Sequence, residues 1–134
     1  MLARNLRRIL PLVSLAIALV FAAPSIAGEM RAFDQAAFAK AQADGKPILV
    51  TVHADWCPVC KRMKPVEDAL LKDPANKDVV AFVVDFDSQT DALKKINVTK
   101  QATQVFFKGA TEVGRHSFVT DKAAMQKLLD RAKS

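Results

Sequence analysis

The chain has 134 residues, with 20 Lys and Arg against 14 Asp and Glu and a formal charge of +6 at pH 7. Small basic proteins often bind nucleic acids, but the charges here are interspersed and no basic run is interleaved with aromatic residues. We therefore expect no nucleic acid among its partners, and the length fits one domain rather than several.

The first 27 residues have the features of a secretory signal peptide. Three arginines and no acid precede an almost unbroken apolar run at 9–23, and the small residues Ser25 and Ala27 stand at the −3 and −1 positions of a cleavage site. The run is shorter than the roughly 20 residues that span a bilayer, although an uncleaved membrane anchor remains the alternative. Cleavage leaves a domain at 28–134 with a charge of +3 and no stable membrane insertion.

Hydrophobic periodicity predicts helix, strand and helix in the first half of this domain. Asp34 is a suitable N-cap for the first helix. The apolar run at 48–54 is typical of a strand buried on both faces. A second helix is expected over 57–71, kinked by Pro65.

The second half alternates strands and helices and then closes with a hairpin. The predicted elements are a strand at 79–86, a short helix from Ser88 or Thr90 to Ile96, strands at 103–108 and 112–118, and a last helix capped by Thr120 or Asp121. Strands separated by helices indicate a parallel part of a sheet, and the hairpin indicates an antiparallel edge. The fold class is therefore α/β, with a central mixed sheet flanked by helices. His116 on the edge strand is expected to be solvated.

Only two cysteines are present, Cys57 and Cys60, both after the predicted leader. A disulfide framework in a small secreted domain usually uses four or more cysteines, and a bridge across two residues closes too small a loop to stabilise much. The pair therefore indicates redox chemistry. Cys57 is expected at a helix N-terminus, where free N–H groups and the helix dipole favour a thiolate. Cys60 lies one turn further on, placed to attack a mixed disulfide.

The surrounding residues resemble the thioredoxin family, in particular its exported bacterial members. The matching phrase is Ala-Asp-Trp-Cys-Pro-Val-Cys-Lys at 54–61, followed by Pro65, and residues 98–99 and 105–108 look like the family's last-but-one strand. The resemblance covers nearly all of the mature chain. It implies the thioredoxin fold, with Cys57 as exposed nucleophile, Cys60 as buried resolving thiol and Trp56 beside the active surface.

The resemblance also implies a periplasmic thiol–disulfide oxidoreductase that acts on protein disulfides. The redox-active disulfide Cys57–Cys60 then serves without any cofactor or metal, a membrane thiol protein supplies electrons, and the protein is a monomer. Pro58 and Val59 lie between the cysteines and include no cation that would stabilise the thiolate. This favours the reducing side over the role of a primary oxidant.

The loop of Gln101, Ala102 and Thr103 departs from the family pattern. Ala102 stands where the family has a cis-proline facing the cysteines. Because a non-proline cis bond costs about 3 kcal/mol, the Gln101–Ala102 bond is predicted to be trans. The loop is still expected to flank the site and to offer backbone groups to a peptide.

Two further departures concern proton transfer. Thr51 and Val83 replace the family's buried acid and its lysine partner, so proton transfer at Cys60 needs water or another group. His53, four residues before Cys57, is a candidate pKa modulator or proton shuttle, or simply a packed strand-end residue. The alternative function is a metal-binding or metal-delivery module, for copper above all, that uses both cysteines with or without His53, because thiolates suit Cu(I).

Overall fold

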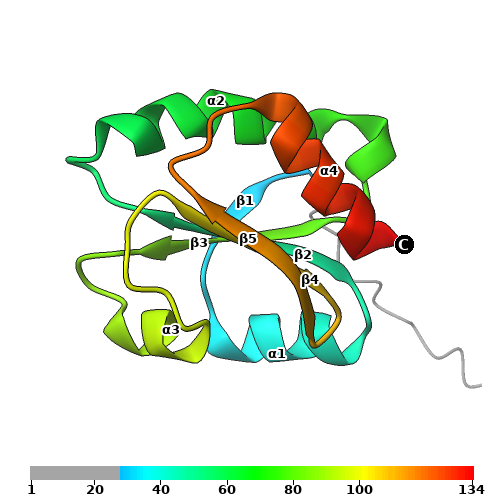
Figure 1. Ribbon diagram of the computed structural model, residues 1–134. Coiled ribbons are helices and arrows are strands. Elements are labelled where there is room, and N and C mark those ends of the chain that lie inside the picture. Colours follow the sequence, from blue (N-terminus) through cyan, green and yellow to red (C-terminus); the bar gives the residue numbers. More distant parts are fainter. Residues whose placement is uncertain (1–27) are drawn as a thin grey trace, which may run out of the picture.

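The computed structural model describes residues 28–134; the predicted signal peptide lies outside the described residues. The elements in chain order are β1 (Met30–Ala32), α1 (Gln35–Ala43), β2 (Pro47–His53), α2 (Pro58–Lys72), a 3-10 turn (Pro74–Asn76), β3 (Val80–Asp85), α3 (Thr90–Lys95), β4 (Thr103–Lys108), β5 (Thr111–Ser117) and α4 (Lys122–Lys133). Figure 1 shows three layers, with α1 and α3 on one face of the sheet and α2 and α4 on the other.

The five strands form one mixed sheet in the order β1-β3-β2-β4-β5. Strands β1 and β2 both pair with β3 in parallel. Strands β2 and β4, and then β4 and β5, pair antiparallel. The α/β class with a parallel part and an antiparallel hairpin is therefore confirmed.

Strand β1 is an element that the sequence pattern did not reveal. It has three residues and pairs with β3 from Met30 opposite Ala81 to Ala32 opposite Val83. So short a segment has too few residues to show an alternating pattern. Its strand conformation follows from pairing with an edge that only the folded sheet provides.

Helix boundaries follow the capping residues closely. Asp34 accepts a hydrogen bond from Ala37 N at 2.7 Å, and Asp121 does the same for Ala124 N at 2.7 Å, as expected for N-caps. Helix α3 starts at Thr90 without a side-chain cap. Ser88 instead donates to Asp85 and helps to form the turn after β3.

Apolar side chains pack against both faces of the sheet. The layer between the sheet and α1 and α3 contains four phenylalanine rings in contact, Phe33, Phe38, Phe82 and Phe107. The layer under α2 and α4 contains both cysteines together with aliphatic residues, two methionines and Phe106. Central strands that are apolar on both faces are explained by this arrangement. Within residues 28–134, no helix is long and apolar enough to cross a membrane.

Candidate active site

Cys57 is the N-cap residue of α2. Its backbone is extended, Pro58 follows at the first helical position, and its Sγ accepts a hydrogen bond from Cys60 N at 3.2 Å. Pro58 lacks an N–H group and so leaves no donor unpaired there. The predicted placement of a thiol at a helix N-terminus is confirmed. Both the free N–H groups and the helix dipole favour negative charge on this sulfur.

Both cysteines are buried free thiols. Cys57 is 1% exposed and Cys60 is 3% exposed, so the expectation of an exposed nucleophile beside a buried thiol is wrong for this structure. The physical reason is the cap itself, because Sγ of Cys57 turns toward the first turn of α2 rather than toward solvent. A reacting partner must therefore approach across the residues that surround Cys57.

Cys60 is held in its protonated form. Burial, together with the hydrogen bond to Cys57, raises the pKa of the Cys60 thiol to about 11, against the lowering effect of the backbone of Ala54 and Ala102. Its Sγ lies 4.0 Å from the carbonyl oxygen of Val52. A thiol in this state needs a proton acceptor before it can attack a disulfide.

Trp56 is an exposed side chain that is nevertheless fixed in place. Its indole N–H donates to Asp87 at 2.9 Å, and its ring packs edge-on against Phe86 with centroids 6.4 Å apart. Asp87 is itself positioned by the turn in which Asp85 accepts hydrogen bonds from Asp87 N and Ser88 N. The structure therefore places Trp56 next to Cys57, as a rigid surface group.

The loop at 101–103 takes the predicted trans form, since no peptide bond of the described residues is cis. Ala102 is fully buried. Its N–H donates to Val52 O at 2.9 Å, and its carbonyl accepts from Phe118 N at 2.8 Å. Thr103 is also buried and begins β4, whereas Gln101 is half-buried. Both backbone groups of Ala102 are thus bonded within the protein, and neither is free for a peptide.

Helix α2 contains a buried carboxyl, that of Glu67, which the sequence pattern did not predict. Glu67 accepts a hydrogen bond from the Thr51 hydroxyl at 2.7 Å and another from the Gln104 side-chain amide. Burial raises the pKa of Glu67, although the hydrogen bonds from Thr51 and Gln104 oppose that effect. Thr51 occupies the strand position where the resembled family has its acid, and here the acid reaches the same place from the facing helix. The available signal was a glutamate among the apolar positions of α2, seven residues after Cys60.

His116 extends this polar group across the sheet. Its Nε2 is hydrogen-bonded to the Gln104 side-chain oxygen, and its ring packs edge-on against Phe106 at 5.4 Å. It is half-buried rather than solvated as expected, and burial lowers its pKa. Because Gln104 donates to Glu67 with its nitrogen, its oxygen accepts from His116, which therefore has its proton on Nε2.

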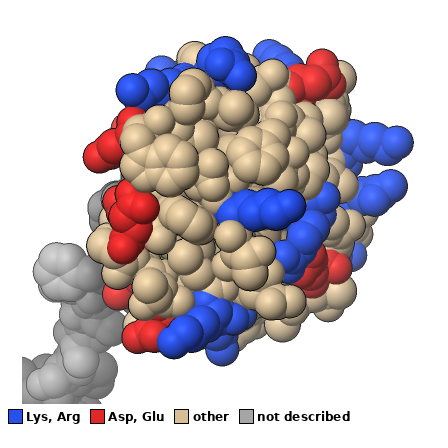
Figure 2. Space-filling view, turned by 60° about the vertical axis from the view of Figure 1, so that its left-hand side comes forward, with Lys and Arg blue, Asp and Glu red and all other residues tan. Residues whose placement is uncertain are grey.

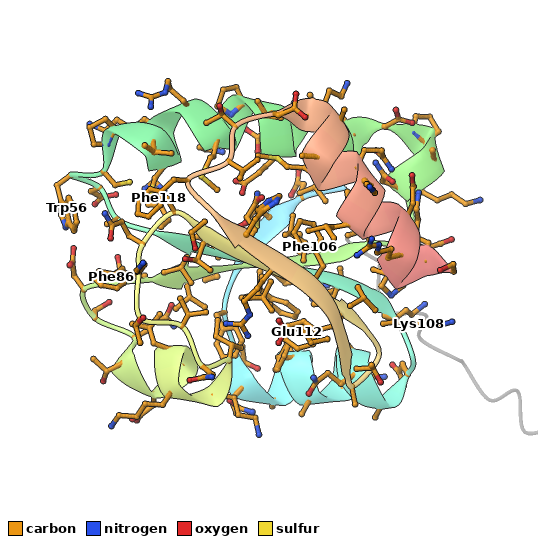
Figure 3. The ribbon with its side chains drawn as sticks, viewed as in Figure 1. Trp56, Phe86, Phe106, Lys108, Glu112 and Phe118 are labelled. Atoms are coloured by element: carbon orange, nitrogen blue, oxygen red, sulfur yellow. The ribbon has the colours of Figure 1, made fainter. Side chains whose placement is uncertain are left out.

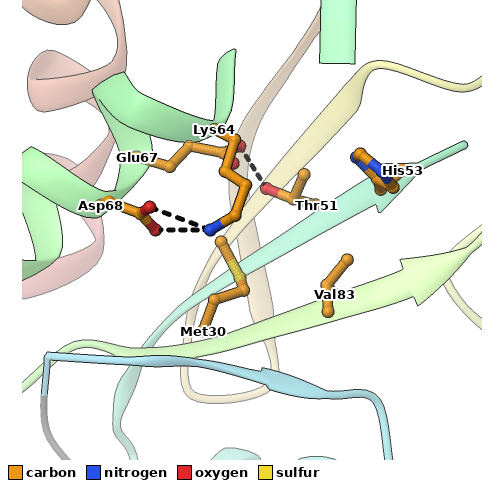
Figure 4. A pocket seen from close by; sticks show the side chains of 7 residues that line it. All are labelled: Met30, Thr51, His53, Lys64, Glu67, Asp68 and Val83. Atoms are coloured by element: carbon orange, nitrogen blue, oxygen red, sulfur yellow. Dashed lines mark hydrogen bonds and ion pairs between the residues drawn. The ribbon is translucent and has the colours of Figure 1, made fainter. Parts of the chain in front are cut away.

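A cavity of about 310 Å³ opens beside Glu67 (Figure 4). Its lining residues are Met30, Thr51, His53, Lys64, Glu67, Asp68 and Val83. At its wall Lys64 and Asp68 form an ion pair at 2.9 Å. The cavity gives the buried carboxyl a route to water.

His53 lies in this cavity wall rather than with the cysteines. Its Nε2 is 3.3 Å from Asp55, on the same turn. Over residues 28–134, no three His, Cys, Asp or Glu side chains are grouped so that they could hold a metal ion. The copper alternative, built on Cys57 and Cys60 with or without His53, is therefore unsupported.

Comparison with known proteins points to one family. The family model described as thioredoxin matches residues 29–131. A thioredoxin-like protein of Fusarium culmorum is 34% identical over 86 residues, which cover 63% of this chain and 71% of that protein. The thioredoxin of Chlamydia trachomatis serovar D is 31% identical over 84 residues, covering 63% of this chain and 80% of its own length.

The solved structures agree. The crystal structure of Trxlp from Edwardsiella tarda EIB202 shares 40% identity and superposes with a TM-score of 0.72, covering 75% of this chain and 98% of that one. The crystal structure of thioredoxin F from spinach chloroplast reaches a TM-score of 0.69 at 22% identity, over 81% of this chain and 90% of its own, and shows the fold alone.

Proposed function

Because this chain belongs to the thioredoxin family of thiol–disulfide oxidoreductases, we propose that it reduces protein disulfides after export to the periplasm. The observation that carries the proposal is the geometry of the cysteine pair. Cys57 caps α2 with its sulfur 3.2 Å from Cys60 N, and Cys60 follows one turn later with its pKa raised to about 11. The first sulfur thus accepts a backbone N–H at the start of the helix, and the second is held as a thiol.

The first step uses Cys57. Its thiolate attacks one sulfur of the substrate disulfide, forming a Cys57–substrate disulfide and breaking the substrate S–S bond, and the departing substrate thiolate takes a proton from water. The N–H groups at the start of α2 stabilise the attacking thiolate. They are already in place through the Cys60 N–H bond.

The second step uses Cys60. Its thiol loses a proton and attacks Cys57 Sγ, which forms the Cys57–Cys60 disulfide and releases the second substrate thiol. Glu67 is the buried group placed to accept that proton. Seven residues separate the two on α2, about 10 Å along the axis, and a helical side chain leans toward the N-terminus and shortens that gap. The cavity beside Glu67 connects this carboxyl to water, but Cys60 is not among its lining residues.

Return to the dithiol requires two electrons and two protons from another thiol protein. We propose a membrane thiol protein as that donor, with no cofactor or metal in the protein itself and a monomer as the working unit. The reducing direction is supported by Pro58 and Val59, which add no cation to stabilise the thiolate. Periplasmic location is supported by the signal-peptide features of residues 1–27.

A redox titration tests the reaction and its direction. The purified protein is equilibrated with glutathione buffers, and the disulfide fraction is followed beside a Cys57→Ser variant. We expect a reversible Cys57–Cys60 disulfide with a potential nearer the roughly −270 mV of thioredoxin than the roughly −120 mV of strong oxidants. Absence of a reversible disulfide would overturn the redox function, and an oxidising potential would overturn the reducing role.

Cell fractionation with N-terminal sequencing tests the location. We expect the protein in the periplasmic fraction with Gly28 as its first residue. Recovery in the membrane fraction with Met1 retained would instead support the uncleaved anchor.

A further inference from the structure

Phe118 combines two unfavourable features in one residue. Its backbone φ is +60°, in the left-handed region, and its side chain is 46% exposed. A left-handed backbone conformation is destabilising for residues other than Gly, Asn and Asp. An exposed aromatic ring also contributes no free energy from burial. Strained residues of this kind are concentrated at functional sites. Phe118 therefore needs an explanation outside the stability of the fold.

The backbone of Phe118 is attached directly to the redox site. Its N–H donates to Ala102 O at 2.8 Å. Ala102 has φ +53°, and its backbone contacts Cys60 closely enough to lower the pKa of that thiol. Two residues with left-handed backbone conformation are thus hydrogen-bonded to each other, one just before β4 and one just after β5. This hydrogen bond fixes the backbone from which the Phe118 side chain projects.

The ring shares its end of the molecule with Trp56. These two are the exposed large hydrophobic residues of the described chain, Trp56 at 57% and Phe118 at 46%. Figure 3 places both at the end where α2 begins. Pro58 is exposed and Val59 is half-buried in the same region. Figure 2 shows an uncharged area over the upper part of the face turned toward this end, with Lys or Arg side chains across its middle and other charged side chains along its margins.

The Trp56 ring and the backbone of Phe118 are both held before any partner arrives. Trp56 is anchored through Asp87 and Phe86, and Phe118 follows the fixed backbone of Ala102. Rigid aromatic groups bind with little loss of conformational freedom. Since both backbone groups of Ala102 are bonded internally, this residue offers a substrate no unpaired N–H, which increases the weight of side-chain contacts at this point.

We propose that Phe118, together with Trp56, is the specificity-determining contact for substrate. It selects a cysteine flanked by an aromatic or aliphatic residue in an extended segment of a disulfide-bonded protein. The apolar neighbour lies against the Phe118 ring while the substrate sulfur is presented to Cys57. This inference rests on the proposed thiol–disulfide exchange at Cys57 but not on its direction.

The test measures one exchange step with a single thiol. A Cys60→Ser background leaves Cys57 as the only cysteine. The substrates are two short peptides, each with one cysteine joined by a disulfide to thionitrobenzoate. One peptide has phenylalanine beside the cysteine and the other has serine. The Cys57 thiolate attacks the peptide sulfur, a Cys57–peptide disulfide forms, and thionitrobenzoate leaves as a coloured thiolate. The rate of colour release therefore reports recognition at Cys57.

In this background we expect the phenylalanine peptide to react roughly tenfold faster than the serine peptide, the factor for one well-packed apolar contact. Phe118→Asn, which tolerates the left-handed backbone, should bring the two rates together by slowing the phenylalanine peptide alone. Phe118→Leu should keep most of the preference. Asn97→Gly relieves a left-handed residue elsewhere, at φ +52°, and should leave both rates unchanged.

Three outcomes would overturn the proposal. One is an unchanged preference in Phe118→Asn, and another is equal slowing of both peptides. The third is a lower urea midpoint in Phe118→Asn, together with its loss of preference, while Phe118→Leu keeps the parent midpoint. That result would show that the ring only supports the fold. Failure of the redox function is distinguishable, because it would appear as the absence of a reversible Cys57–Cys60 disulfide in the parent, whereas failure of recognition would appear as equal colour release from the two peptides.

Discussion

The two core layers, one on each face of the sheet, differ in the residues that they contain. Under α1 and α3 the core cluster is apolar and four phenylalanines meet edge to face or at a tilt. Under α2 and α4 the core contains the two cysteines, and the polar group of Thr51, Glu67 and Gln104 is buried there as well. The strands alternate between these faces, so neighbouring residues such as Val50 and Thr51 belong to different layers.

This difference separates stability from chemistry. Dense apolar packing contributes most of the free energy of folding and tolerates no unpaired charge. The other layer accepts a buried carboxyl and a thiol that resists ionisation, both of which cost stability when charged. Substitutions in the two layers should therefore fail in different ways, one in unfolding and the other in catalysis.

The largest expected effect is on the apolar layer. Phe38 contacts Phe33, Phe82 and Phe107, so Phe38→Ala should lower the free energy of unfolding by about 3–5 kcal/mol. Urea denaturation measures this loss. The redox potential of the folded fraction should stay at the parent value, and a large shift in that potential would show that the layers are not separate.

Glu67→Gln should have a smaller effect on stability and a larger one on turnover. The amide has the same shape, and its oxygen can still accept hydrogen bonds from Thr51 and Gln104, but it cannot take up a proton. Release of the mixed disulfide should therefore slow by about a hundredfold. Quenched-flow trapping of the Cys57–substrate intermediate measures this rate. Asp68→Asn, at the wall of the same cavity, is the matched control and should leave the rate close to that of the parent. Equal rates in Glu67→Gln and parent would remove Glu67 from proton transfer.

The same variant predicts a dependence of stability on pH. Burial raises the pKa of Glu67 in the folded protein, so the unfolded chain loses this proton at lower pH than the folded one. The stability that the protonated Glu67 contributes is fully present below its pKa in the unfolded chain, and it is lost as the pH rises through its pKa in the folded protein. Glu67→Gln should thus match the parent at acidic pH and be more stable at neutral pH, as urea midpoints would show. A gap that widens toward acid would contradict the direction of this shift.

The smallest effects should come from the helix caps, and they should be alike in both layers. Asp34→Ala removes the cap of α1 and Asp121→Ala that of α4, each with a bond of 2.7 Å. Each should cost about 1 kcal/mol in thermal or urea unfolding. Loss of redox activity in either variant, beyond its loss of folded protein, would show that caps influence the cysteines.

Much of the fold was predictable because local rules act over a few residues. The caps at Asp34 and Asp121, the strand at Thr103–Lys108 and the position of Cys57 at a helix start all follow from spacing and residue type. Strand β1 was not predictable, since its three residues are ordered by pairing with β3. The half-buried position of His116 was missed for a similar reason, because its partner Gln104 lies on the neighbouring strand.

The sequence by itself determined the redox pair, its place at a helix N-terminus and the trans bond before Ala102, because these depend on neighbours within one turn. Only the tertiary structure decided which acid is buried beside Thr51, since Thr51 and Glu67 are 16 residues apart and meet across a helix and a strand. It also joined Ala102 to Phe118 and buried Cys57. Contacts between distant segments depend on how whole layers pack, and no local pattern records them.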